Sequence, residues 1–189
     1  MSISLTKGQK ISLTKEAPRL DRVIVGLGWD ESKAPFVTTI DCDAFALALK
    51  GGRLVSQADI IYYGAKHHVS GTINHMGDNL TGAGEGDDEQ IIIDLSQIPS
   101  GYDRIVVAVN IYRCVPKKQH FGMISNAFIR LVDASTQKEI ARYSLTDDYS
   151  DKTAVAFGEL YRHGAEWKFN AIGQGTTDAS IAEFAKHYQ

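Results

Sequence analysis

The part of this sequence best suited to chemistry is an acidic, glycine-rich stretch. From Gly77 to Glu89 it reads GDNLTGAGEGDDE. Between Gly71 and Asp103 the chain carries seven acidic residues and no lysine or arginine. Like charges this close together repel one another unless a cation lies among them. The stretch therefore predicts a binding site for a cation.

Calcium is the cation that this stretch suits best. Calcium takes about six to eight oxygen ligands in irregular geometry, whereas magnesium prefers an octahedron and keeps several waters. Gly82, Gly84 and Gly86 let the backbone turn tightly and present its carbonyl groups. Side-chain oxygens come from Asp78, Asn79, Thr81, Glu85, Asp87, Asp88 and Glu89. We expect Ca²⁺ as the cofactor, with more than one ion bound.

A second acidic cluster precedes and follows apolar runs earlier in the chain. Asp30 follows the run Val23–Leu27, and Asp41 and Asp43 flank Cys42 just before the run Ala44–Leu49. Residues two apart on a strand face the same side, so Asp41 and Asp43 would project together from one strand end. We expect them to complete the calcium site. The alternative is that they are turn or strand-start aspartates.

Known calcium motifs do not explain the loop. An EF-hand requires oxygen ligands where Leu80 and Gly82 stand, and a glycine where Ala83 stands. A calcium-binding β-roll needs several stacked repeats, and this chain has one copy. The remaining alternative is a solvated acidic turn.

The chain as a whole predicts one domain, spanning residues 1–189. Its 189 residues are 43% hydrophobic, which is enough to bury a full core. The N-terminus lacks the apolar stretch of a signal peptide and no apolar run reaches membrane-spanning length, so we expect a soluble, cytoplasmic protein. Cys42 and Cys114 have no metal-ligand spacing and are expected to be unpaired thiols.

Short β-branched and aromatic runs separated by turn residues predict a mainly β fold, a sandwich of two packed sheets. The run Ile105–Val109 is apolar at every position, which indicates a central strand covered on both faces. At the C-terminus, Asp178 or Ser180 can cap a short helix that packs on a sheet. The expected strands are 10–13, 22–28, 41–49, 60–63, 90–95, 104–112, 127–132, 139–143, 155–161 and 167–172.

The whole chain resembles the tellurite-resistance TerD family of bacterial stress-response proteins. The residues that carry the resemblance are Ile3–Gly8, Ser12–Lys15, Gly26–Asp30, Asp41–Ala44, Gly77–Gly82, Glu85–Glu89, Ala127–Arg130, Phe157–Arg162 and Trp167–Phe169. The chain departs from the family pattern at Gly64–His68 and at Cys42.

The resemblance implies a calcium-binding β-sandwich without known enzymatic activity, associated with resistance to tellurite and other chemical stress. It also implies that the calcium sites map onto the glycine-rich loop together with Asp30, Asp41 and Asp43. We expect a sensor or scaffold whose partners are other stress-response proteins.

An enzyme is the first rival interpretation. A metal-assisted hydrolase would use His67, His68 or His75 as a general base, but the chain has no GxSxG and no Cys-His signature to accompany it. A zinc site from the same histidines lacks a fixed third ligand, because adjacent histidines on a strand point to opposite faces. We therefore expect no enzymatic activity.

Calcium-dependent membrane docking is the second rival, because bound calcium would convert a repulsive acidic loop into one that attracts anionic lipid. Leu80 and Met76 are the main apolar residues such a loop offers. Nucleic acid is not an expected partner, since the sequence has no basic stripe and its pI is about 6.1.

Overall fold

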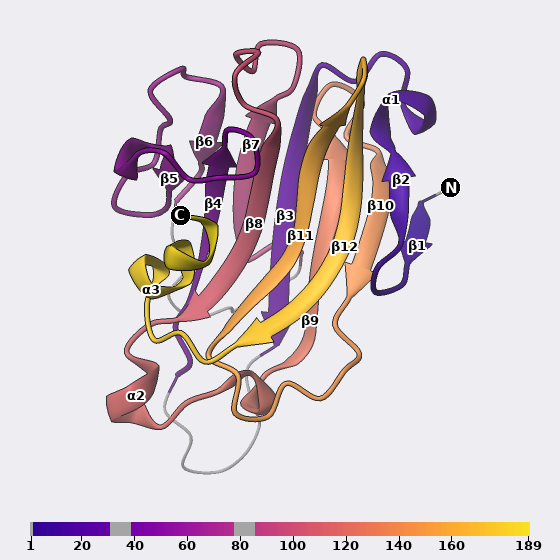
Figure 1. The fold of residues 1–189 in the computed structure, drawn as a ribbon. Coiled ribbons are helices and arrows are strands. Elements are labelled where there is room, and N and C mark those ends of the chain that lie inside the picture. The colour runs from indigo at the N-terminus through magenta and orange to yellow at the C-terminus, as the bar shows by residue number, and fades with distance from the viewer. Residues whose placement is uncertain (1, 31–38, 78–85) are drawn as a thin grey trace.

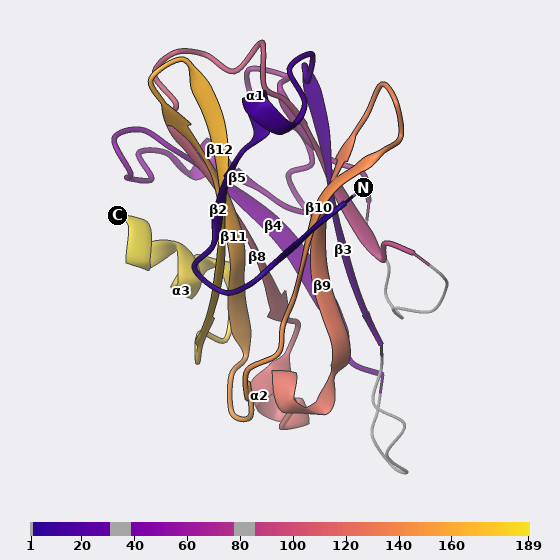
Figure 2. The same cartoon turned by 90° about the vertical axis from the view of Figure 1, so that its right-hand side faces the viewer.

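Two six-stranded sheets packed face to face make up the protein, for which a computed structural model describes residues 2–30, 39–77 and 86–189. Figure 1 shows the strands running along the long axis of the molecule, and Figure 2 shows the two sheets edge-on. The first sheet contains, in spatial order, β1 (Ile3–Leu5), β10 (Glu139–Ser144), β9 (Ser125–Asp133), β3 (Arg22–Asp30), β7 (Glu89–Asp94) and β6 (Ile73–His75). The second contains β2 (Lys10–Ser12), β12 (Glu166–Thr176), β11 (Ala154–His163), β8 (Arg104–Ile111), β4 (Cys42–Leu49) and β5 (Ile60–Ile61). The predicted β-sandwich is confirmed.

The helical segments are short and lie between or after the strands. They are α1 (Leu13–Glu16), α2 (Cys114–Lys117) and α3 (Ile181–Ala185), with 3₁₀ turns η1 (Gln57–Asp59), η2 (Phe121–Met123) and η3 (Lys186–Tyr188). Within the ranges that the structure describes, no helix combines the length and the apolar character that crossing a bilayer requires.

Strand β8 shows how the core is built. Its residues alternate between the two faces of the second sheet, as strand geometry requires. Ile105, Val107 and Val109 point into the core between the sheets, whereas Val106 and Ala108 join a second apolar cluster on the outer face. All five are fully buried, which confirms that an uninterrupted apolar run marks a strand covered on both sides.

The C-terminal helix α3 covers that outer face. The Ser180 side chain accepts a hydrogen bond from the backbone N–H of Glu183 and so caps the helix, as predicted. Phe184 packs edge-on against Phe45 of β4, with ring centroids 5.1 Å apart. The helix thus closes the second apolar cluster, beside the position of Asp43 on the same strand.

Two strands of the first sheet were missed by the sequence pattern. β1 and β6 are three residues long each, too short for an alternating pattern to stand out. The short helices α1 and α2 were missed as well. Of these four elements, β6 matters most for function, because it leads into the acidic loop.

Candidate functional site

The acidic loop is the connection between the antiparallel strands β6 and β7 at an edge of the first sheet. The structure describes both of its flanks, up to Gly77 and again from Gly86. The backbone N–H of Met76 donates to the Gln90 carbonyl across the two strands, 2.9 Å away. The predicted ligands Asp78, Asn79, Thr81 and Glu85 lie outside the described residues.

His75 fixes the first flank of the loop. Its Nδ1 accepts a hydrogen bond from the backbone N–H of Gly77, 3.2 Å away, which places the ring proton on Nε2. Nε2 donates toward the Ala44 carbonyl oxygen at 3.1 Å and lies 3.3 Å from Oε2 of Glu89. Both ring nitrogens of His75 are therefore engaged in positioning the chain.

Glu89 fixes the second flank. Its Oε2 accepts the backbone N–H of Ala44 at 2.6 Å, so this carboxylate joins β7 of the first sheet to β4 of the second. The side chains of Glu89 and His75 are both fully buried. A buried carboxylate is stable only when it is well hydrogen-bonded, and this one ties the loop to both sheets.

Asp87 forms an ion pair with Arg130 on the outer face of the first sheet. Its Oδ1 lies 2.6 Å from Nε of Arg130 and its Oδ2 3.1 Å from Nη2, and Gln90 donates to Oδ2 as well. The carboxylate lies over Gly26, where a Cβ atom would collide with it. Only 1% of the Asp87 side chain is exposed. Arg130 thus balances the Asp87 charge without a metal ion.

Asp88 lies near enough to Asp30, the last residue of β3, for their charges to interact. Oδ2 of Asp88 accepts the backbone N–H of Trp29 at 2.7 Å, and the Asp88 N–H donates to the Leu27 carbonyl. Burial raises the pKa of the Asp88 carboxyl, and the nearby negative charges of Asp30 and Asp87 raise it further, against the lowering effect of the Trp29 N–H. The structure therefore places these two predicted ligands within the influence of each other's negative charge.

The exposed side chain of Asp30 is oriented by β9. Its Oδ2 accepts a hydrogen bond from the side-chain amide of Asn126, which adopts a left-handed backbone conformation with φ 54°. A carboxylate has about four lone-pair sites, so one such bond leaves capacity for a cation.

Asp41 and Asp43 lie at the same end of the molecule but belong to the second sheet. Asp43 is the second residue of β4 and is buried on the outer face of that sheet, near Phe45 and α3. Asp87 lies on the outer face of the first sheet, so the thickness of the sandwich separates the two carboxylates. Asp41 precedes β4, where its carbonyl accepts the backbone N–H of Tyr112.

The thiol of Cys42 lies within the electrostatic influence of the carboxylates at this end of the molecule. Burial raises the pKa of its thiol well above the usual value, and the charges of Asp43, Glu89, Asp41 and Asp88 raise it further. Carboxylates from both sheets therefore act on one point between them. Cys42 and Cys114 are both free cysteines and both are buried.

The remaining histidines of the sequence analysis form structural hydrogen bonds. Nδ1 of His68 contacts Oγ of Ser70 at 2.6 Å, and Nε2 contacts Oδ1 of Asp59 at 3.0 Å. Tyr102 also donates to Oδ1 of Asp59, at 2.7 Å.

His67 lies elsewhere, with its Nδ1 2.8 Å from Oδ1 of Asn74. In the described part of the chain, no three His, Cys, Asp or Glu side chains are grouped so as to hold a metal ion.

The sequence analysis did not identify Arg130 as a partner of the acidic loop. Its signal was a single basic residue inside the otherwise apolar run 127–132. A charge at such a position needs a partner, because Arg is almost never buried unpaired.

Comparisons with known proteins identify the family of this chain. The TerD domain model matches residues 1–188. The stress response protein SCP2 of Bacillus subtilis is 46% identical, with the whole of both chains aligned. The tellurium resistance protein TerD of Serratia marcescens is 47% identical over 93% of this chain and 91% of its own length.

A solved structure shows the same fold. It is that of a homologue of the telluride resistance protein TerD from Streptomyces coelicolor, with a TM-score of 0.71 and 24% identity over 88% of this chain and 95% of that one. Family model, relatives and fold all point the same way: the chain belongs to the TerD family.

Proposed function

We propose that this protein is a calcium-binding, non-catalytic sensor or scaffold of a bacterial stress response, with a part in resistance to tellurite or other chemical damage. Its relatives carry names for stress response, tellurium resistance and resistance to chemical damage. The partners in this proposal are other stress-response proteins, which would contact the acidic end of the sandwich.

The observation that carries the proposal is that the charges of Asp30 and Asp88 interact at the flank of the acidic loop. Burial, and after it the negative charge of Asp30, raises the pKa of the Asp88 carboxyl, so a divalent cation there would relieve part of the repulsion between the two carboxylates. Exposed carboxylate oxygens are the ligands that calcium prefers. The donor set therefore fits a hard cation.

The ten predicted ligands have different roles in this proposal. Asp30 and Asp88 are the described residues best placed to bind calcium, with Asp41 near the same end and Asp78, Asn79, Thr81 and Glu85 supplied by the loop. Asp87 and Glu89 support the loop instead, through Arg130 and through Ala44 with His75. Asp43 faces a cavity on the second sheet.

The histidine contacts favour a non-catalytic role. A general base must be able to take a proton from a substrate within hydrogen-bond reach. His75 and His68 are buried and use both ring nitrogens in contacts within the protein. Neither ring is placed to exchange a proton with a substrate.

Calorimetric titration of calcium into chelator-stripped protein tests the proposal. We expect saturable binding that is lost in the double variant Asp30→Asn/Asp88→Asn. The matched control is Asp21→Asn, an exposed aspartate just before the opposite end of β3, which should bind as the wild type does. No binding by the wild type, or unchanged binding in the double variant, would refute a calcium site at this position.

Membrane docking is the competing function, and Met76 is the residue that favours it. This side chain is 58% exposed at the start of the acidic loop. Sedimentation with anionic vesicles, with calcium and with chelator, separates the two functions. Calcium-dependent sedimentation lost in Met76→Ser would favour docking, whereas protein that stays in solution under both conditions favours the sensor or scaffold.

A further inference from the structure

A second candidate site lies on the outer face of the second sheet. It is a cavity of about 370 Å³ bounded by β4, β8, the residues after β8 and the start of α3. Ligand pockets usually span about 300–1,000 Å³, so this one is the size for a small molecule. None of the described residues that line it belongs to the acidic loop.

The floor of the cavity is polar and buried. Asp43 of β4 and Asn110 of β8 are opposite each other in the sheet and are 4% and 3% exposed. Oδ1 of Asn110 has no hydrogen-bond partner among the described residues. A buried amide oxygen without a partner is costly, so this one is suited to accept a hydrogen bond from a ligand. A carboxylate beside it favours a donor that carries positive charge.

The walls are aromatic and aliphatic. Tyr62 and Tyr112 line the cavity together with Ile181 from the first turn of α3. Tyr112 is 39% exposed, which makes the opening accessible from solvent. Aromatic faces attract cations within about 6 Å of the ring centroid, so these walls also favour a positively charged group.

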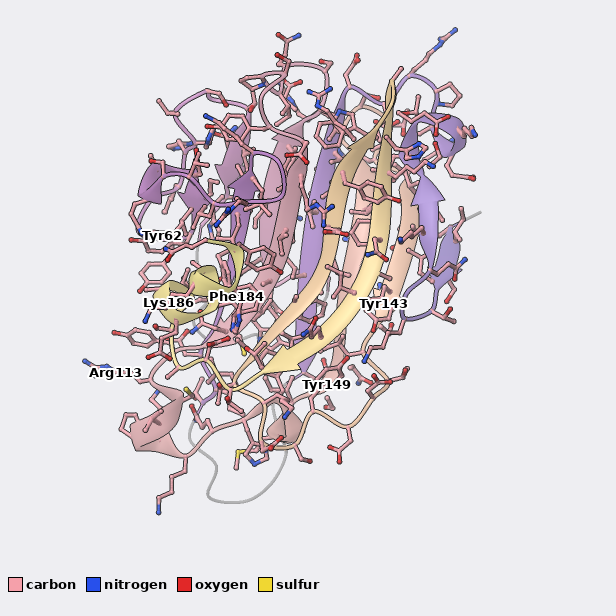
Figure 3. The ribbon with its side chains drawn as sticks, in the orientation of Figure 1. Tyr62, Arg113, Tyr143, Tyr149, Phe184 and Lys186 are labelled. Carbon is pink, nitrogen blue, oxygen red and sulfur yellow. The ribbon has the colours of Figure 1, made fainter. Side chains whose placement is uncertain are left out.

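The opening carries a guanidinium group. Arg113 follows Tyr112 directly and adopts a left-handed backbone conformation with φ 54°. Its guanidinium carbon lies 5.5 Å from the centroid of the Tyr112 ring. Figure 3 shows Arg113 and Tyr62 on the side of the molecule where α3 lies. Arginine at this point suits an anionic group, above all a carboxylate, which it binds in a bidentate manner.

We propose that this cavity binds a small zwitterion, a molecule with an ammonium group at one end and a carboxylate at the other. The ammonium group would donate to Oδ1 of Asn110 and to Asp43 on the floor, between Tyr62 and Tyr112. The carboxylate would pair with Arg113 at the opening. Such a ligand would bind the acceptors Asn110 and Asp43 on the floor and the donor Arg113 at the opening at the same time.

Direct binding measurements test the proposal. Calorimetry in chelator-containing buffer would use ω-amino acids of increasing length, from glycine to 6-aminohexanoate. Hexylamine and hexanoate serve as controls that keep one charged end each. We expect one length in the series to bind most tightly and both controls to bind at least about tenfold more weakly, as expected when a charge-assisted hydrogen bond is lost.

Two variants locate the ligand. Arg113→Asn keeps the left-handed conformation, which asparagine tolerates, and removes the guanidinium group. Its matched control is Lys118→Asn. Lys118 directly follows helix α2, which Arg113 directly precedes; it has a similar left-handed conformation with φ 52° and does not line the cavity. We expect Arg113→Asn to bind the ligand about tenfold more weakly and Lys118→Asn to bind it as the wild type does.

The floor is tested by Asn110→Leu, with side-chain amide NMR signals of Asn110 as a second readout in the wild type. We expect the variant to lose binding and the Asn110 amide signals to shift on addition of the ligand. No binding by any ω-amino acid, equal binding of hexylamine, or unchanged binding in Arg113→Asn would overturn the proposal.

Discussion

Asp87 and Asp88 are adjacent in sequence and have opposite surroundings. Asp87 is enclosed by Arg130 and Gln90, whereas Asp88 lies beside Asp30. The Asp87 carboxylate has a cationic partner, whereas the Asp88 carboxylate is under the influence of another negative charge. At the scale of single residues, the neighbours of a carboxylate thus decide its role, and the sequence does not show these neighbours.

The Asp87–Arg130 pair predicts a stability effect. Arg130→Gln leaves the buried Asp87 carboxylate without its charged partner, and since the Arg130 side chain is 29% exposed we expect a loss of about 2–3 kcal/mol. Arg22→Gln is the matched control, because the Arg22 side chain pairs with Asp94 while 57% exposed and should cost under about 1 kcal/mol. Urea denaturation measures both, and equal losses would contradict the prediction.

The raised pKa of Tyr102 predicts that the free energy of unfolding falls at alkaline pH. Burial, and then its hydrogen bond to Asp59, raise the pKa of Tyr102 to about 12 from the ordinary value of 10.0. Between these values the unfolded chain has lost a proton that the folded protein keeps, so stability falls as pH rises through this window and is fully present below it. Tyr102→Phe should therefore show a shallower decline in unfolding free energy from about pH 10 to about pH 12. An identical decline in the variant would assign the effect to other groups.

At the scale of elements, the alternating and uninterrupted apolar runs predicted the strands that form both sheets and the helix that begins after Ser180. The strands β1 and β6 are too short to give a pattern, and their pairing depends on partners distant in sequence. For the same reason, the sequence placed Asp41 and Asp43 on one strand end but did not reveal that the sandwich separates Asp43 from Asp87. Local patterns predict which residues share a face, whereas the sheet order decides which faces meet.

The packing of helix α3 on the second sheet predicts an effect on stability. Phe184 is 2% exposed and packs on Phe45, so Phe184→Ala should cost about 3–5 kcal/mol by leaving a cavity on the second sheet. Lys186→Ala, a change at the exposed end of the same helical segment, should stay within about 0.5 kcal/mol. Thermal unfolding compares the two variants. If Phe184→Ala were as stable as Lys186→Ala, the helix would contribute little to the sandwich.

At the scale of the whole molecule, the acidic end connects the two sheets. Glu89 of the first sheet accepts the backbone N–H of Ala44 of the second, and carboxylates from both sheets act on Cys42. Negative charges of both sheets are thus concentrated around Cys42, and like charges repel one another. A cation bound there would lower that repulsion for the molecule as a whole, not only for the loop.

This arrangement predicts that calcium stabilises the entire sandwich. At a free calcium concentration of one hundred times the dissociation constant, ligand linkage gives a gain of about 2.7 kcal/mol in unfolding free energy. Hydrogen exchange should slow at the backbone N–H groups of Gly77 and Asp88, whose hydrogen bonds to His75 and Leu27 hold the loop flanks.

The same measurement in Asp30→Asn/Asp88→Asn provides the control, because that variant keeps the flanking hydrogen bonds of His75 and Glu89 but lacks the two charges. It should show neither the gain in unfolding free energy nor the slower exchange. If calcium left the wild type unchanged in both respects, the acidic end would be held by Arg130, His75 and the backbone alone, and its carboxylates would act as parts of the fold rather than as ligands.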